Sequence, residues 1–319
     1  MIADLPKNIE SASIRIRPFI RKTYFAYSNI FSNLLEAKVR LKMENLQFTG
    51  SFKARGAMNK LLSLTKDQRH KGIVSASTGN HGAAVAYSAE KLDTPCLIFV
   101  PKDASSAKLH NIKNYGAKIQ VYGGDCVESE KKAREVANLN NQIYVSPYND
   151  PYVIAGQGTV GFEIHDQCTG LDVIIISVGG GGLIAGIASY LKSVWPDLHV
   201  IGCSPTNSAV MIHSMNKGEI LDLESKPTLS DGTAGGLEKD AITLPICMEN
   251  IDETVLVTEN EIKDAMISFI KYEHLLLEGA AGTAIAALMK MKDKLKGKRV
   301  GVVICGGNIS IDIIKQIFN

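Results

Sequence analysis

Residues 173–192 read VIIISVGGGGLIAGIASYLK: an apolar run, four consecutive glycines and a second apolar stretch. The β-branched run at 173–178 is typical of a buried strand, and residues 184–192 are typical of a helix. Glycines leave backbone N–H groups unshielded and permit positive φ, so several N–H groups can converge on one anion. The helix start adds partial positive charge. A flexible turn would need only one or two glycines, so the stretch predicts a phosphate site.

The glycine loop lacks the spacing of the two common nucleotide motifs. It has no G-x-G-x-x-G pattern, and no Lys-Ser/Thr pair follows it as in a P-loop. The phosphate should therefore belong to a cofactor of another kind.

Short apolar runs of strand length alternate with helical patterns on both sides of this loop. Such alternation predicts an α/β fold with parallel sheets covered by helices. Ligands in these folds bind at the carboxyl ends of the strands, where the glycines lie. The expected strands are residues 73–75, 96–100, 118–122, 173–178, 200–203 and 300–305, and the expected helices are residues 81–91, 106–115, 129–138 and 184–192.

The composition of the 319-residue chain is that of an ordinary globular protein. Its net charge is +2 and its Lys and Arg residues are scattered, so nucleic acid or anionic lipid is not an expected partner. The six cysteines form no C-x-x-C pair and no zinc-ligand spacing. No apolar run is long enough to cross a membrane, and the N-terminus has no signal-peptide core. We expect a cytoplasmic protein.

Residues 42–57 read KMENLQFTGSFKARGA and carry a lysine, Lys53, whose flanks are distinctive. Taken alone, Lys53 would most often be an exposed amine. Taken with its flanks, the segment resembles the Schiff-base segment of the serine/threonine dehydratase and serine racemase family, pyridoxal-phosphate enzymes of the tryptophan-synthase-β-like fold. Four more stretches agree with that family in the expected order: STGNHG at 77–82, GGGGL at 179–183, EGAAG at 278–282 and CGGN at 305–308.

The resemblance implies that pyridoxal 5'-phosphate is the cofactor and that Lys53 forms the Schiff base with it. Apolar neighbours such as Phe52 and Ala54 should lower the pKa of the lysine by desolvation. In the family, Asn80 would lie on the phenolic oxygen of the ring, Phe52 against a ring face and Gly232 close to another side. The residues implied to bind the cofactor are Phe52, Lys53, Asn80, Gly179, Gly180, Gly181, Gly182, Leu183, Gly232, Glu278 and Cys305.

By the same resemblance, Cys305 is the partner of the ring nitrogen. A thiol is no acid at neutral pH, so the ring nitrogen stays largely unprotonated and the ring is a weaker electron sink. A weaker sink favours elimination over transamination. The alternative is that Cys305 is a small buried hydrophobic residue.

The loop at 77–82 offers hydroxyls, open amides and a helix start, which together suit an anion. In the family this loop binds the substrate carboxylate, so the implied substrate residues are Ser77, Thr78, Gly79, Asn80 and His81. His81 could instead be a helix-capping or core histidine. Racemases carry Ser as a second base where this chain has Thr78, so racemisation is weakened but not excluded.

Two further stretches bear on the metal and on the substrate. Related racemases bind a divalent cation through an acidic pair, but residues 204–210 read SPTNSAV, so we expect no metal. Residues 228–238, TLSDGTAGGLE, resemble a subgroup that includes dehydratases of hydroxyectoine utilisation. The natural substrate can therefore differ from serine or threonine.

The function implied is that of a dehydratase, or ammonia-lyase, acting on a small hydroxy amino acid such as L-threonine or L-serine. Lys53 would remove the α-proton and the β-hydroxyl would leave, giving a 2-oxo acid and ammonia after hydrolysis. The main alternative is an amino-acid racemase. β-Replacement enzymes carry Thr where His81 stands, and a non-catalytic protein would not need Lys53 together with Asn80.

The resemblance also implies two lobes with the cofactor between them. We expect a large domain formed by residues 1–71 and 150–319 and a small inserted domain formed by residues 72–149. A homodimer is expected from the family. The chain ends soon after its last expected helix, so a regulatory C-terminal domain and feedback by isoleucine are not expected.

Overall fold

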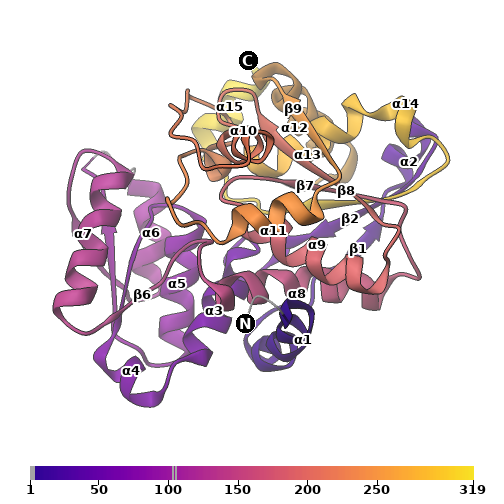
Figure 1. Cartoon of the computed structure of the whole chain (residues 1–319). Helices are drawn as coiled ribbons and strands as arrows, with labels where there is room; N and C mark the ends of the chain where they lie inside the picture. Colours follow the sequence, from indigo (N-terminus) through magenta and orange to yellow (C-terminus); the bar gives the residue numbers. More distant parts are fainter. Residues whose placement is uncertain (1–3, 103, 105) are drawn as a thin grey trace.

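The computed structural model describes residues 4–102, 104 and 106–319 and contains two β-sheets (Figure 1). The larger sheet has six strands in the order β1-β2-β10-β7-β8-β9. β1 pairs with β2 in the antiparallel sense, and the other neighbours are parallel. Its strands are β1 (Phe25–Tyr27), β2 (Lys38–Met43), β7 (Val173–Ser177), β8 (His199–Pro205), β9 (Glu253–Val257) and β10 (Arg299–Ile304).

The smaller sheet has four parallel strands in the order β5-β4-β3-β6. These are β3 (Ile73–Ala76), β4 (Cys96–Val100), β5 (Lys118–Val121) and β6 (Ile143–Tyr144). Four helices accompany it: α4 (Lys66–Lys71), α5 (Asn80–Lys91), α6 (Ser106–Asn114) and α7 (Cys126–Leu139). In Figure 1 this group, purple to magenta, lies beside the larger sheet.

Helices cover both faces of the larger sheet. α13 (Gly279–Lys290) contacts β7, β8, β9 and β10, while α9 (Gly182–Val194) contacts β7 and is backed by α8 (Pro151–Gln167) and α1 (Leu5–Ile16). Figure 1 shows α13 and α9 on opposite sides of the sheet. The remaining helices are α2 (Asn29–Leu35), α3 (Lys53–Ser63), α10 (Val210–Lys217), α11 (Thr243–Asn250), α12 (Glu259–Glu273), α14 (Lys292–Leu295) and α15 (Ile311–Phe318), with 3₁₀ turns η2 (Arg17–Phe19), η3 (Glu44–Leu46) and η4 (Asp231–Thr233).

The predicted parallel-rich α/β class is confirmed, and the apolar runs of strand length explain it. Every residue of β7 is buried, as expected for a strand covered on both faces. Most boundaries differ from prediction by one or two residues. α7 begins three residues earlier than expected because the Asp125 carboxylate caps it, accepting from the Glu128 N–H at 2.8 Å.

Helix α3 joins the two sheets. It packs against α8 of the larger group and against α5 of the smaller group. Its residues Ala57 and Leu61 belong to the same buried cluster as Ile73 and Val85 of the smaller group. The first residue of this bridging helix is Lys53, so the lysine lies where the two groups meet.

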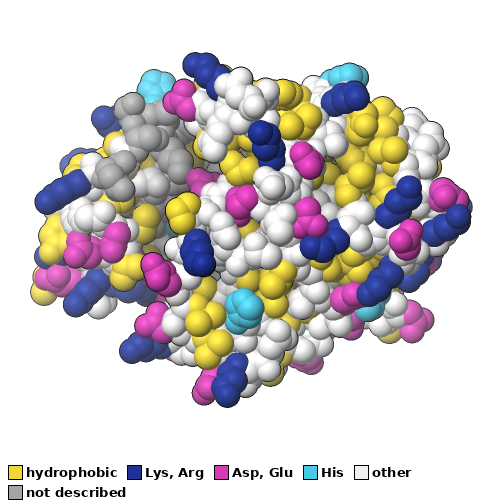
Figure 2. All heavy atoms as spheres, turned by 90° about the horizontal axis from the view of Figure 1, so that it is seen from above, with side chains coloured by type: hydrophobic (Ala, Val, Ile, Leu, Met, Phe, Trp, Pro, Cys, Tyr) yellow, Lys and Arg dark blue, Asp and Glu magenta, His cyan; other side chains and the backbone are white. Residues whose placement is uncertain are grey.

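The surface carries mixed charge. On the described part of the face seen in Figure 2, basic and acidic side chains are interspersed, with no continuous basic field. Among the described residues, no helix combines the length and apolar character needed to cross a membrane.

Candidate active site

The four-glycine loop connects β7 to α9 in a space that admits no side chains. A Cβ on Gly180 would lie 2.5 Å from the ring of Tyr148, and one on Gly179 would lie 2.9 Å from the backbone of Thr233. Gly181 has φ +83°, which a residue with a side chain rarely adopts. No side chain caps α9, and no N–H of Gly179, Gly180 or Gly181 is hydrogen-bonded within the described chain. The loop therefore presents free N–H groups at a helix start, as an anion site requires.

Lys53 is held from two directions. The N–H of the preceding residue, Phe52, donates to the carbonyl of Cys305 at the end of β10 (3.0 Å). The Nζ atom donates to the carbonyl of Pro147 (2.8 Å) and lies 5.2 Å from the centre of the Phe52 ring. The backbone bond fixes the start of α3 against the larger sheet, while the side chain reaches the turn that follows β6.

Burial lowers the pKa of Lys53 to about 8, although Cys305 and Glu278 both act to raise it. Burial also raises the pKa of the Cys305 thiol well above its usual value, and Glu278 adds to the effect. Cys305 is therefore a neutral thiol at physiological pH. The amine of Lys53 is able to lose its proton close to neutrality, as a nucleophile or base must.

Glu278 forms a polar cluster with two asparagines. Both oxygens of its buried carboxylate accept from Nδ2 of Asn80 (2.8 Å each), and Nδ2 of Asn308 donates to Oδ1 of Asn80 (2.7 Å) and to the carbonyl of Thr49 (2.8 Å). Burial raises the pKa of Glu278 to about 7, the Asn80 bonds oppose this rise, and Asp231 adds to it. A Cβ on Gly232 would lie 3.5 Å from Oε1 of Glu278, so Gly232 lies beside this cluster.

The loop after β3 leads into α5, which begins at Asn80 and has no side-chain cap. Its residues Ser77, Thr78 and Gly79 are half-buried, and the Ser77 hydroxyl accepts from the N–H of Gly79 (3.2 Å). The uncapped helix start suits the predicted carboxylate.

His81 is buried, and its Nε2 lies 2.9 Å from the carbonyl of Val145. Because a carbonyl only accepts, Nε2 carries the proton. Burial, together with the nearby charge of Lys53, lowers the pKa of His81 to about 3. Its Nδ1 has no hydrogen-bond partner within the described part of the chain. The geometry favours the core histidine over a charged ligand, and the contribution of His81 to substrate binding stays a prediction.

The structure thus joins most of the predicted positions through contacts. Lys53, Phe52 and Cys305 are linked at the start of α3, and Asn80, Glu278 and Gly232 form the neighbouring cluster. The turn after β6 links Lys53 to the glycine loop. Its Pro147 carbonyl accepts from Lys53, and its Tyr148 ring covers Gly180 in the loop formed by Gly179 to Gly182 and followed by Leu183.

Sequence reasoning did not identify Pro147, Tyr148 or Asn308 as site residues. Asn308 follows the glycines of the CGGN stretch, which was a usable signal. Nothing in the sequence around Pro147 and Tyr148 indicates their contacts, which depend on the packing of the two groups.

Residues 204–210, which correspond to the cation site of related racemases, make other contacts here. The hydroxyl of Ser204 donates to the carbonyl of Val178 (2.7 Å), directly before the glycine loop, and Val210 is buried. No group of three or more His, Cys, Asp or Glu residues is placed to hold a metal within residues 4–102, 104 and 106–319. The absence of a metal requirement stays a prediction.

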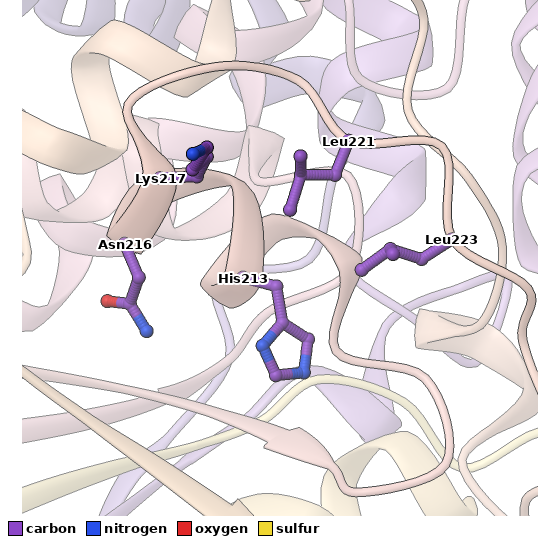
Figure 3. A pocket seen from close by; sticks show the side chains of 5 residues that line it. All are labelled: His213, Asn216, Lys217, Leu221 and Leu223. Carbon is purple, nitrogen blue, oxygen red and sulfur yellow. The ribbon is translucent and has the colours of Figure 1, made fainter.

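Two surface hollows lie apart from this site. One lies along α10 and the chain that follows it, lined by His213, Asn216, Lys217, Leu221 and Leu223 (Figure 3). The other is lined mainly by residues of α1, the segment 16–22 and α8. Neither contains Lys53 or the glycine loop, so the candidate active site rests on the contacts of the predicted residues.

Comparison with known proteins identifies the family. The family model for pyridoxal-phosphate dependent enzymes matches residues 16–306. The chain is 38% identical to an L-threonine ammonia-lyase of Thermotoga maritima, over 98% of this chain and 78% of that protein. It is also 38% identical to the catabolic L-threonine dehydratase TdcB of Escherichia coli, over 98% and 97% of the two chains.

Solved structures show the same fold. Maize serine racemase superposes with a TM-score of 0.92 at 30% identity, covering 98% of this chain and 96% of that one. A threonine deaminase of Solanum lycopersicum superposes with a TM-score of 0.93 at 29% identity, covering 99% and 92%. The family match spans most of the chain and includes the assembled residues from Phe52 to Cys305, while Asn308 lies just beyond it. This chain belongs to the family of pyridoxal-phosphate-dependent enzymes.

Proposed function

We propose that this enzyme is a dehydratase, or ammonia-lyase, that removes the β-hydroxyl of L-threonine or L-serine to give a 2-oxo acid and ammonia. The observation that carries the proposal is the amine of Lys53, with its pKa lowered to about 8, next to the buried neutral thiol of Cys305. Relatives named L-threonine ammonia-lyase and L-threonine dehydratase, both 38% identical, support the choice of substrate.

The residues present fit the cofactor. The free N–H groups of Gly179, Gly180 and Gly181 suit its phosphate, and Lys53 is the amine that would bind it covalently. Phe52, Asn80, Leu183, Gly232, Glu278 and Cys305 are the side chains and backbone that we propose surround it. When bound, the cofactor accepts the electron pair released at Cα as the α-proton leaves.

Lys53 carries the proton in this mechanism. Its neutral amine takes the α-proton of the substrate, a transfer that contributes roughly 10²–10⁴-fold. The Pro147 carbonyl, 2.8 Å from Nζ, orients the amine. As a neutral thiol, Cys305 would not protonate the ring nitrogen of the cofactor. The ring would then hold the electron pair less strongly, which favours loss of the β-hydroxyl over transamination.

The substrate carboxylate is assigned to the uncapped start of α5. Ser77, Thr78, Gly79 and Asn80 offer hydroxyl, amide and backbone donors there, and the partial positive charge of the helix start favours an anion. None of these residues is bulky or charged, which suits a small hydroxy amino acid.

An amino-acid racemase is the second candidate, favoured by the likeness to maize serine racemase. Racemisation needs a base on each face of the planar carbon centre. Lys53 serves one face, and Thr78 is the residue proposed for the other. The threonine methyl restricts χ1 and takes space beside Cα, which weakens this route.

The two functions are separated by one assay. D- and L-β-hydroxy amino acids are supplied separately, and both the 2-oxo acid formed and the enantiomers remaining are measured. We expect 2-oxo acid from the L-isomers, with elimination faster than inversion. Formation of D-serine faster than pyruvate would overturn the dehydratase proposal in favour of a racemase.

We also propose the architecture around this chemistry. Residues 1–71 and 150–319 are proposed as the large domain and residues 72–149 as the small one, a boundary that leaves α4 with the large domain although it accompanies the smaller sheet. A homodimer is proposed from the family. The proposed compartment is the cytoplasm.

A further inference from the structure

Glu238 lies in the segment between η4 and α11, and its carboxylate joins that segment to the smaller group. Oε1 accepts from the hydroxyl of Ser146 (3.1 Å), and Oε2 accepts from Nδ2 of Asn149 (2.9 Å). Oε2 also pairs with Nη2 of Arg134 on α7 (2.8 Å). The N–H of Glu238 donates to the Tyr148 hydroxyl (2.7 Å). One residue thus contacts three members of the turn 146–149.

The turn 146–149 in turn contacts both essential parts of the active site. Its Pro147 carbonyl accepts from Nζ of Lys53 at 2.8 Å. Its Tyr148 ring covers the glycine loop so closely that a Cβ on Gly180 would lie 2.5 Å away, and one on Gly182 would lie 3.0 Å from Cβ of Tyr148. A shift of this turn would therefore move the acceptor of Lys53 and uncover the glycine loop together.

Glu238 is well placed to hold the turn. Its side chain is 19% exposed, so its bonds are shielded from water more than those of surface pairs. Arg134 is itself held, since it also pairs with Glu130 (2.8 Å) and lies 4.1 Å over the ring of Tyr144. The segment is tied a second time where Oδ1 of Asn149 accepts from the N–H of Ile242 (2.9 Å).

We propose that Glu238 is a positioning residue, which holds the turn 146–149 so that the Pro147 carbonyl orients Lys53 and the Tyr148 ring closes the glycine loop. The inference rests on the proposed roles of Lys53 and the glycine loop. Glu238 touches neither of them directly and acts through the turn. Glu238 is the last residue of the TLSDGTAGGLE stretch, and the proposed mechanism gives Glu238 no other role.

The test compares three variants of the holoenzyme. Glu238→Ala removes all three side-chain contacts. Glu238→Gln keeps the size and one acceptor oxygen but loses the charge that pairs with Arg134. Glu249→Ala is the matched control, because Glu249 is exposed on the neighbouring helix α11. For each variant, kcat, KM, the melting temperature and the rate at which borohydride reduces the cofactor link to Lys53 are measured.

We expect Glu238→Ala to lower kcat by about 10- to 100-fold, since a displacement of about 1 Å in a positioned group can cost ~100-fold. KM should change less than kcat, and borohydride should reduce the link faster because the Pro147 carbonyl no longer lies against Nζ of Lys53. Glu238→Gln should recover only part of the loss, because it lacks the charge that pairs with Arg134, and Glu249→Ala should resemble the wild type. The borohydride rate can be read even if no hydroxy amino acid is turned over, so failure of the proposed function is distinguished from failure of this inference.

Two outcomes would overturn the inference. The first is a Glu238→Ala enzyme whose kcat and borohydride rate both match those of Glu249→Ala. The second is a loss of activity in Glu238→Ala and Glu238→Gln that follows the melting temperature alone, with the borohydride rate unchanged below melting. If Glu238→Ala does not fold, Glu238→Gln is compared with the wild type instead. Wild-type values of kcat and of the borohydride rate for Glu238→Gln would then contradict the positioning role of Glu238.

Discussion

At the scale of single residues, the proposed chemistry depends on the charge states of three neighbouring groups. Lys53 has a pKa of about 8, Glu278 has one of about 7, and Cys305 stays neutral. Burial is the main cause of all three shifts. Each shift disfavours the charged form, so Lys53 and Glu278 change charge near neutral pH, where both would be fully ionised on the protein surface.

The first prediction concerns the pH at which the cofactor-free protein captures pyridoxal phosphate. Lys53 must lose its proton before it attacks, so the capture rate should rise through about pH 8 instead of near its ordinary pKa of 10.5. Above pH 7 the Glu278 carboxylate is ionised and raises the pKa of Lys53. Glu278→Gln should therefore move the midpoint to lower pH. Stopped-flow absorbance across pH 6 to 10.5 measures the rate, and a midpoint near 10 in the wild type would contradict the account.

A second prediction concerns Thr78. Replacing it by Ser removes the methyl that restricts χ1 while retaining the hydroxyl. Thr78→Ser should therefore raise racemisation relative to elimination with L-serine. Chiral chromatography of the remaining amino acid, run beside a 2-oxo acid assay, gives the ratio. An unchanged ratio would show that Thr78 does not serve the second face, and Thr78→Ala controls for the loss of the hydroxyl.

At the scale of elements, the start of α3 is held by a buried ionic network. The guanidinium of Arg55, two residues after Lys53, donates to both oxygens of Glu44 (2.7 and 2.8 Å) and both oxygens of Glu163 (2.7 and 2.9 Å). Lys42 adds a second cation, bonded to Glu163 at 2.6 Å. These residues come from β2, η3, α3 and α8, so the network joins the bridging helix to the larger group.

The third prediction is that Arg55→Met destabilises the fold by about 3–5 kcal/mol, because it leaves the buried carboxylate of Glu44 without its ion-pair partner. Denaturant unfolding measures the change in the free energy of unfolding. Lys296→Met is the control: Lys296 pairs with Glu36 at 2.6 Å, but both side chains are more than half exposed. That variant should unfold almost as the wild type does. Equal stability of the two variants would mean that the network does not hold α3.

Strand β8 gives the fourth prediction. Related racemases carry a carboxylate at the position of Ser204. Here the Ser204 hydroxyl donates to the carbonyl of Val178, and Val210 is apolar. A hard cation prefers several oxygen ligands, carboxylates above all. Dialysis against a chelator should therefore leave the rate of 2-oxo acid formation nearly unchanged, with a metal-dependent relative as the positive control. A loss restored by Mg²⁺ or Ca²⁺ would show that another carboxylate fills the gap.

The sequence predicted the elements well where the signal is local. The apolar run before the glycines, the glycines themselves and the helix after them needed only adjacent residues, and each is present. The antiparallel strand β1 and the double packing of α3 were not predicted, because they depend on partners far along the chain. For the same reason Pro147 and Tyr148 were missed: the contacts that give them a role join β6, α3 and the glycine loop.

At the scale of the whole molecule, the site exists only where the two sheets meet. The larger sheet supplies the glycine loop and Cys305, the smaller one supplies Asn80, and Lys53 begins the helix that packs on both. Glu238 and Arg134 cross the same junction. Ligands commonly bind at such junctions, since each side can be rigid while the gap between them remains accessible.

This arrangement supports the proposal that Lys53 is the lysine that binds the cofactor. Lys42 is fully buried but paired with Glu163, and Lys60 is paired with Asp150. Within the part of the chain that the structure describes, the Lys53 amine is bonded only to the carbonyl of Pro147, and its pKa is lowered to about 8. Of these three lysines, it is the one whose amine is free to become a nucleophile near neutral pH.

The most direct measurement is therefore borohydride reduction of the holoenzyme followed by peptide mass spectrometry. The account predicts one reduced pyridoxyl group per chain, on the peptide containing Lys53, with loss of 2-oxo acid formation in step with labelling. Lys53→Ala should take up no label at that peptide and should lose elimination, while Lys60→Arg should be labelled as the wild type is. A label on Lys42, Lys60 or any other lysine, or full turnover by Lys53→Ala, would contradict the account.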